Sequence, residues 1–147
     1  MAEAERAVAL APTDAEGYLW LGWILNYVGR PEEGITKLEQ AMRLNPQYPF
    51  FYLWTLGHAY YLTGRSAEAI ATLKKLVEQN PNFLPAHAFL SILYSEQGRD
   101  QDARAEAMAA SMLSPQASLE SLRQLVPYRN EKDLERFLAG MRKAGIK

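Results

Sequence analysis

The chain has 147 residues, no cysteine and a formal charge of −1, with 16 basic and 17 acidic residues. The lack of cysteine excludes disulfides, thiolate catalysis and cysteine-ligated zinc, and the balanced charge provides no basic field that would attract nucleic acid or anionic lipid. No apolar run reaches the roughly 18 residues of a membrane span, and no basic stretch leads into an apolar core. We therefore expect no membrane association and no export signal, and predict a soluble cytoplasmic protein.

The first predicted helix is short and stands before the main pattern of the chain. Residues 3–11 have a helical pattern, and their end, Leu10-Ala11-Pro12, matches Leu44-Asn45-Pro46 further along. We interpret residues 1–12 as a half repeat, so that the array begins halfway through a repeat.

Three copies of one sequence pattern follow. A small residue, Gly22, Gly57 or Ser91, stands after a leucine and recurs after 35 and then 34 residues. Each copy continues to a Gly-Arg pair and closes at a proline, where a helix ends because the residue before proline avoids the α region. The copies span 15–48, 50–83 and 84–117, and the predicted helices are 15–28, 31–44, 50–63, 66–79, 84–97 and 100–113.

Two terminal helices are predicted after the third copy, over 117–126 and 131–144. Asn130 is a suitable N-cap for the last helix, and Gly145 is a suitable residue to follow its end. The last helix has an apolar face that needs cover, formed by Leu134, Phe137, Leu138 and Met141. Either the third repeat covers this face, which makes residues 118–147 a cap, or a second subunit does. The short link before Asn130 favours the cap, because it keeps the loop entropy of the intramolecular contact small.

The period and its glycine, small-residue and proline positions resemble the tetratricopeptide repeat, whose unit is a pair of antiparallel helices. The resemblance implies an all-α, right-handed superhelical solenoid with C-terminal capping helices, forming one domain over residues 1–147. One such unit cannot bury its apolar face alone, so the units stack and present a surface that usually holds a protein or peptide.

A set of mainly aromatic residues is left over once the positions that pack within each repeat are assigned. These residues lie in the first helices of the first two repeats, 15–28 and 50–63. In the family the first helix of each repeat lines the concave surface. We therefore predict a partner-binding groove made by Leu19, Trp23, Asn26, Tyr27, Phe51, Trp54, His58 and Tyr61. An open aromatic groove is costly unless a partner covers it. The alternative is that these rings pack against the neighbouring repeat or the terminal helices, since Trp and Tyr are often partly buried.

One familiar subclass of the family binds the acidic C-terminal peptides of heat-shock chaperones through Lys, Asn and Arg side chains on its first helices. The corresponding positions here hold side chains that cannot bind a carboxylate, namely Leu19, Trp23, Thr55, Pro85 and Phe89. We therefore exclude this subclass.

The C-terminal stretch carries a second resemblance. Residues 125–130, Leu-Val-Pro-Tyr-Arg-Asn, and residues 133–145, which begin Asp-Leu-Glu-Arg-Phe-Leu, resemble the tail that closes repeat domains at the end of bacterial class III adenylate or guanylate cyclases. The segment from Pro46 to Tyr61 is also similar to those proteins. The resemblance implies the C-terminal regulatory or oligomerisation part of a signalling protein, whose catalytic domain is absent from this chain.

No pattern of catalytic residues is found. The sequence lacks the motifs of P-loop NTPases, HExxH metalloproteases, GxSxG hydrolases and GxGxxG dinucleotide-binding proteins, and His58 and His87 lack a metal-binding spacing. His58 is the more interesting of the two, because it lies among the groove residues and histidine titrates near neutrality. We predict no catalytic residue, metal, cofactor or small-molecule substrate, and a protein or peptide partner or another subunit. The competing hypothesis is a free-standing scaffold or chaperone of a secretion or envelope system.

Overall fold

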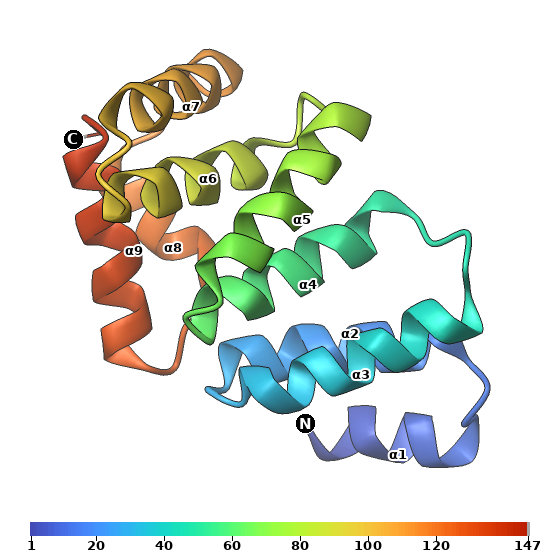
Figure 1. Ribbon diagram of the computed structural model, residues 1–147. Coiled ribbons are helices and arrows are strands. Elements are labelled where there is room, and N and C mark those ends of the chain that lie inside the picture. The colour runs from blue at the N-terminus through green and yellow to red at the C-terminus, as the bar shows by residue number, and fades with distance from the viewer. Residues whose placement is uncertain (147) are drawn as a thin grey trace. The chain divides into compact units, whose positions relative to one another are not determined.

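The computed structural model describes residues 1–146, apart from the side chain of Leu125, and every regular element in this part of the chain is an α-helix (Figure 1). The helices are α1 (Ala2–Leu10), α2 (Ala15–Tyr27), α3 (Pro31–Leu44), α4 (Phe50–Leu62), α5 (Ser66–Gln79), α6 (Leu84–Glu96), α7 (Asp100–Leu113), α8 (Leu119–Leu125) and α9 (Glu131–Lys143). The predicted helices are thus confirmed to within one or two residues, and the fold is all-α with paired helices of the predicted type.

The chain divides into two compact units, Met1–Thr72 and Leu73–Lys147. In the first unit α2 packs against α3 and α4, and α1 packs against α2. In the second unit α6 packs against α7 and α9, and α8 packs against α9.

The three Gly-Arg pairs form the turns between paired helices. Gly29, Gly64 and Gly98 have φ angles of 86°, 76° and 74°, in the left-handed region that other residues rarely adopt. The arginine after each glycine binds an acidic side chain in the first turn of the next helix, giving the pairs Arg30–Glu33, Arg65–Glu68 and Arg99–Asp102. Each Gly-Arg pair therefore forms a tight turn, and its arginine makes an ion pair with the first turn of the second helix.

Helices α2 and α3 approach each other closely at glycines. A Cβ atom added to Gly22 would lie 2.9 Å from Cγ of Leu38 and 3.3 Å from the carbonyl oxygen of Gly34. In the third repeat Ser91 replaces this glycine, and its Oγ donates a hydrogen bond of 2.9 Å to the carbonyl oxygen of Ala103. Small residues at these positions therefore set the distance between the paired helices.

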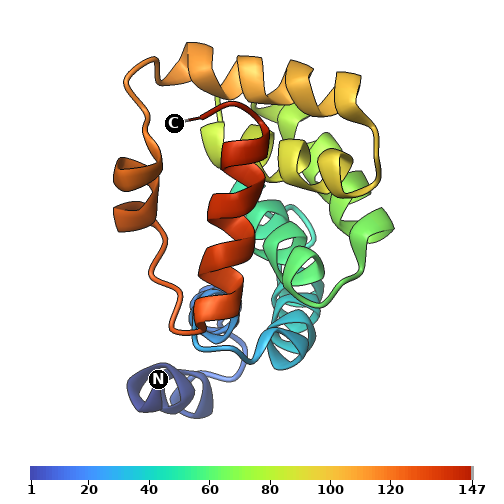
Figure 2. The ribbon, with the colours of Figure 1, turned by 90° about the vertical axis from the view of Figure 1, so that its left-hand side faces the viewer.

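Helix α9 covers one face of α6 (Figures 1 and 2). Phe137 stacks on Phe89 with ring centroids 5.3 Å apart, and the buried residues of α9 are Phe137, Leu138 and Met141. Arg136 donates two hydrogen bonds, of 2.8 and 2.7 Å, to the carboxylate of Glu96. The apolar face of the last helix thus lies against the third repeat, as the cap interpretation expected.

The two ends of α9 also agree with the sequence-based prediction. The side chain of Asn130 accepts a hydrogen bond of 2.9 Å from the backbone N–H of Lys132, and Gly145 has a φ of 99°. Helix α8 begins two residues later than predicted, because Ser118 and Ser121 form a reciprocal capping box at its N-terminus.

We expect Gly22→Ala to destabilise the fold by about 1–3 kcal/mol, because the added methyl group would overpack the contact with Leu38. Gly17→Ala is the matched control in the same helix. Its Cβ would lie 3.6 Å from Val8, an ordinary contact, so the change should be neutral or stabilising by about 0.5–1 kcal/mol. Urea denaturation of both variants measures the difference, and equal effects would contradict the close approach at Gly22.

We expect Gly140→Ala to weaken the packing of α9 on α6, because its Cβ would lie 2.5 Å from Cγ1 of Ile92. The predicted loss is about 1–3 kcal/mol of unfolding free energy. Ile92→Ala removes both Cγ atoms from this contact, so the further loss that it causes should be smaller in Gly140→Ala than in the wild type. Strictly additive losses in denaturation experiments would show that the two residues do not meet.

Candidate functional site

The first unit contains a chain of ring contacts that joins α2 to α4. Trp20 lies 5.6 Å from Phe51 and 6.3 Å from Trp23, measured between ring centroids. Trp23 lies 4.9 Å from Tyr27, which lies 5.0 Å from His58. His58 in turn stacks on Trp54 at 5.1 Å and contacts Tyr61 at 6.3 Å. We call this set of seven residues the aromatic cluster.

Burial within the aromatic cluster increases from one end to the other. Trp20 is 50% exposed, and Trp23 and Phe51 are partly exposed. At the other end His58 and Tyr61 are completely buried. The cluster therefore has an interior part, which stabilises the fold, and an exposed edge, which faces solvent.

Most of the residues predicted to line the groove belong to the interior. The buried ones are Leu19, Asn26, Tyr27, Trp54, His58 and Tyr61, while Trp23 and Phe51 are partly exposed. An open groove requires exposed rings, and this conformation instead matches the alternative in which most of them are packed. Contact of the eight residues with a partner stays a prediction, and only Trp23 and Phe51 of the eight now reach the surface.

Asn26 connects the two first helices of the unit. Its Nδ2 donates a hydrogen bond of 3.0 Å to the backbone carbonyl of Thr55. Its Oδ1 is buried, accepts no hydrogen bond from the described residues, and lies 2.9 Å from the position of a Cβ on Gly34. Asn26 thus has an interior partner in α4 and holds α2 in register with it.

The polar groups of the aromatic cluster are uncharged near neutral pH. Burial lowers the pKa of His58 to about 3, so its imidazole stays neutral. Burial also raises the pKa of Tyr27 to about 12. The expectation that His58 titrates near neutrality is therefore wrong for the folded protein, because its ring is fully desolvated.

His87 has the polar partners that the sequence did not indicate. Its Nδ1 lies 2.6 Å from a carboxylate oxygen of Glu106 in α7, and its Nε2 lies 2.7 Å from the carbonyl oxygen of Pro81. His87 is buried, and it ties α6 to α7 and to the loop before α6.

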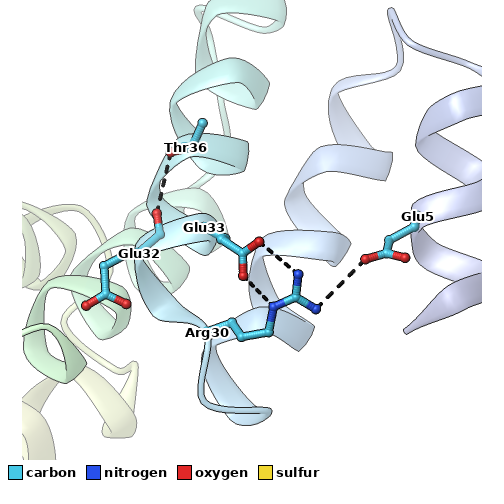
Figure 3. Close-up of polar contacts among 5 residues, drawn as sticks. All are labelled: Glu5, Arg30, Glu32, Glu33 and Thr36. Carbon is cyan, nitrogen blue, oxygen red and sulfur yellow. Dashed lines mark hydrogen bonds and ion pairs between the residues drawn. The ribbon is translucent and has the colours of Figure 1, made fainter.

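A cleft of about 320 Å³ lies between α1 and the first helix pair. Arg30 stands at its edge, where it binds Glu33 and reaches Glu5 of α1 at 4.0 Å (Figure 3). Thr36 and Glu32 are joined nearby by a hydrogen bond of 3.5 Å from Oγ1 to a backbone carbonyl. In the other two repeats the arginine of the turn lies over a tyrosine ring, Tyr60 or Tyr94. In the first repeat Leu25 replaces that tyrosine, and Arg30 contacts α1 instead.

The described residues contain no group of three or more His, Cys, Asp or Glu side chains that could hold a metal ion. Among the same residues, no helix combines the length and the apolar character that a bilayer crossing needs.

The model of the tetratricopeptide repeat family matches residues 27–87 and 64–126. No curated protein matches the chain. The solved structures that are similar to it include the following two. One is MamA, with 18% identity, a TM-score of 0.70, and coverage of 96% of this chain and 82% of that one. The other is PilW, described as a widely conserved type IV pilus biogenesis factor, with 22% identity, a TM-score of 0.72, and coverage of 96% of this chain and 62% of that one. At these identities the likeness establishes the fold.

The folded pKa of His58, about 3, lies below its ordinary value of 6.5, so only the unfolded chain binds this proton between those pH values. Stability from the neutral ring is complete above pH 6.5 and decreases as the pH falls toward 3. Between pH 6.5 and 5 the loss should be about 2 kcal/mol. His58→Phe, which keeps a ring on Trp54, should remove this part of the pH dependence. Denaturation at pH 7.5 and 5.0 tests it, and an unchanged pH dependence in the variant would contradict the burial of a neutral His58.

Proposed function

We propose that this chain, which belongs to the tetratricopeptide repeat family, is a protein-binding module without catalytic activity of its own. The paired helices supply a rigid scaffold, and repeat arrays of this kind serve to hold partner proteins. The exposed edge of the aromatic cluster is the observation that carries the proposal. A half-exposed Trp20 beside Trp23 and Phe51 gives a protein surface the residue types that dominate binding energy.

The chemistry of the surface limits the partner. Glu16 lies one helical turn before Trp20 on α2, so one carboxylate stands on the same side of the helix as the exposed ring. A partner segment with an apolar side chain for the rings and a lysine or arginine for this carboxylate fits this arrangement. The other six residues of the predicted groove are buried and could contact a partner only after a change in packing. They are Leu19, Asn26, Tyr27, Trp54, His58 and Tyr61.

The finer proposal is that the module is the C-terminal regulatory or oligomerisation part of a cytoplasmic bacterial signalling protein that resembles an adenylate or guanylate cyclase. It is supported by the similarity of residues 125–145 to the tail of such proteins. In this chain the stretch forms the end of α8, the link and the capping helix α9.

The alternative is a free-standing scaffold or chaperone that binds a peptide. The likeness to MamA and PilW along 96% of the chain fits this alternative equally well. The domain content of the native protein in its source cells separates the two. A free-standing scaffold should be detected without a catalytic domain, whereas a regulatory part should be detected within a larger protein that carries one.

We expect Trp20→Ala to weaken partner binding by about 2 kcal/mol, roughly 30-fold in Kd, because it removes a central aromatic anchor. Partners captured by the immobilised chain are identified by mass spectrometry, and calorimetry then gives Kd for the wild type and the variant. Thermal stability should change little, since half of the ring is already exposed.

Trp54→Ala is the matched control, because Trp54 is the buried tryptophan of the same unit. It should cost about 3–5 kcal/mol of stability, and binding per folded molecule should change less than in Trp20→Ala. Normal binding by Trp20→Ala would refute a role of the exposed edge.

A further inference from the structure

Two arginines of this protein each contact a ring and a carboxylate at the same time. In the second repeat the guanidinium carbon of Arg65 lies 4.6 Å from the ring centroid of Tyr60, and the same group donates hydrogen bonds of 2.8 and 2.6 Å to Glu68. In the third repeat Arg99 lies 4.4 Å from the ring centroid of Tyr94 and makes an ion pair with the first turn of α7. A guanidinium can make both contacts, because its flat face stacks on a ring while its N–H groups point outward from the edge.

Trp20 and Glu16 offer a ring and a carboxylate on α2 without a cation. Trp20 is 50% exposed, and the exposed Glu16 precedes it by four residues, about 6 Å along the helix axis. Side chains of a helix lean toward its N-terminus, so the indole of Trp20 leans toward Glu16. Among the described residues no lysine or arginine lies over the Trp20 ring or pairs with the carboxylate of Glu16. A cation for this pair would therefore come from another molecule.

The neighbouring rings hold the indole of Trp20 in place. Its centroid lies 6.3 Å from that of Trp23, with the ring planes at 76°, and 5.6 Å from that of Phe51, with the planes at 43°. A ligand that covers the exposed part of the indole thus meets a ring that is already ordered, which lowers the entropy cost of binding.

The chemistry of this pair favours arginine among the side chains of a protein partner. An apolar side chain would cover the indole, but it would displace water from Glu16 without a hydrogen bond in return. A lysine ammonium is compact and strongly hydrated, and it cannot stack on the ring. A guanidinium is more weakly hydrated, stacks on indole and can bind a carboxylate through two parallel hydrogen bonds.

We propose that Trp20 and Glu16 form an arginine-binding site, in which an arginine of the partner protein stacks on the exposed part of the indole and donates hydrogen bonds to the carboxylate. The proposal rests on the partner-binding role of the exposed edge and names the partner residue that this edge recognises. Trp23 and Phe51 then contact apolar neighbours of that arginine. Because the ion pair is exposed, added salt weakens it, and Glu16 contributes less to binding than Trp20 does.

Titration of the full ¹⁵N-labelled chain with N-acetylarginine amide tests the site without the partner. The indole N–H resonance of Trp20 should shift to saturation. N-acetylcitrulline amide, which is neutral and has nearly the same shape, and N-acetyllysine amide should bind at least about threefold more weakly. Lysine or citrulline ligands that bind as tightly as the arginine ligand would overturn the proposal.

Glu16→Gln should reduce binding of the arginine ligand to the level of the citrulline ligand. Glu32→Gln is the matched control, because Glu32 is an exposed carboxylate in the first turn of α3. This control should bind the arginine ligand like the wild type. Equal binding by Glu16→Gln and Glu32→Gln would show that the carboxylate of Glu16 does not contact the ligand, and would also overturn the proposal.

Calorimetry with a captured partner separates this proposal from the broader one. Glu16→Gln should raise Kd about two- to fivefold. Trp20→Leu, which keeps an apolar side chain without a ring face, should raise Kd at least about threefold. If Trp20→Ala weakens binding while Glu16→Gln leaves Kd unchanged, the exposed edge binds the partner but the arginine-binding site is refuted. If all three variants bind normally, both proposals fail.

Discussion

The close approach of the paired helices, seen at α2–α3 and at α6–α7, is the constraint on which the rest of the structure depends. At Gly22 and Gly34 there is no room for a side chain, and at Ser91 a hydroxyl bridges directly to the backbone of α7. Because the paired helices lie this close, their large apolar residues must extend to either side of the pair and find other cover. In the first unit α4 provides part of that cover for α2, and in the second unit α9 provides it for α6. The aromatic cluster and the α9 cap therefore both bury apolar residues that a close helix pair cannot bury by itself.

The aromatic cluster joins a buried interior to an exposed edge, and we propose that the interior serves stability and the edge serves binding. Its interior part is neutral, since burial keeps His58 unprotonated, and each favourable ring pair adds about 0.5–1.5 kcal/mol beyond the area it buries. A partner that contacts Trp20 would thus meet a ring that is already held in position by Trp23 and Phe51. Such preorganisation lowers the entropy that binding must offset, which supports a scaffold that recognises its partner with little rearrangement.

Much of this architecture could be predicted from the sequence, because the Gly-Arg turns, the closing prolines and the 34- to 35-residue period are local signals. The cap could also be predicted, since the spacing of Phe137, Leu138 and Met141 gives the last helix an apolar face that needs cover. The exposed edge of the aromatic cluster could not be predicted from the sequence. Trp20 follows Leu19 directly, and a shift of one residue rotates a helical position by about 100°. Whether a ring is interior or exposed depends on the neighbours that cover it, which periodicity alone does not show.

The central claim is that this protein binds its partner through the exposed edge of the aromatic cluster rather than through its interior. The chain has three tryptophans, and each gives one indole N–H resonance in a ¹⁵N-labelled sample, assigned through single Trp→Phe variants. Titration with a captured partner should shift or broaden the resonances of Trp20 and Trp23, while the resonance of the buried Trp54 stays in place. A partner that moves Trp54 and leaves Trp20 unchanged would contradict the account and restore the open groove predicted from the sequence.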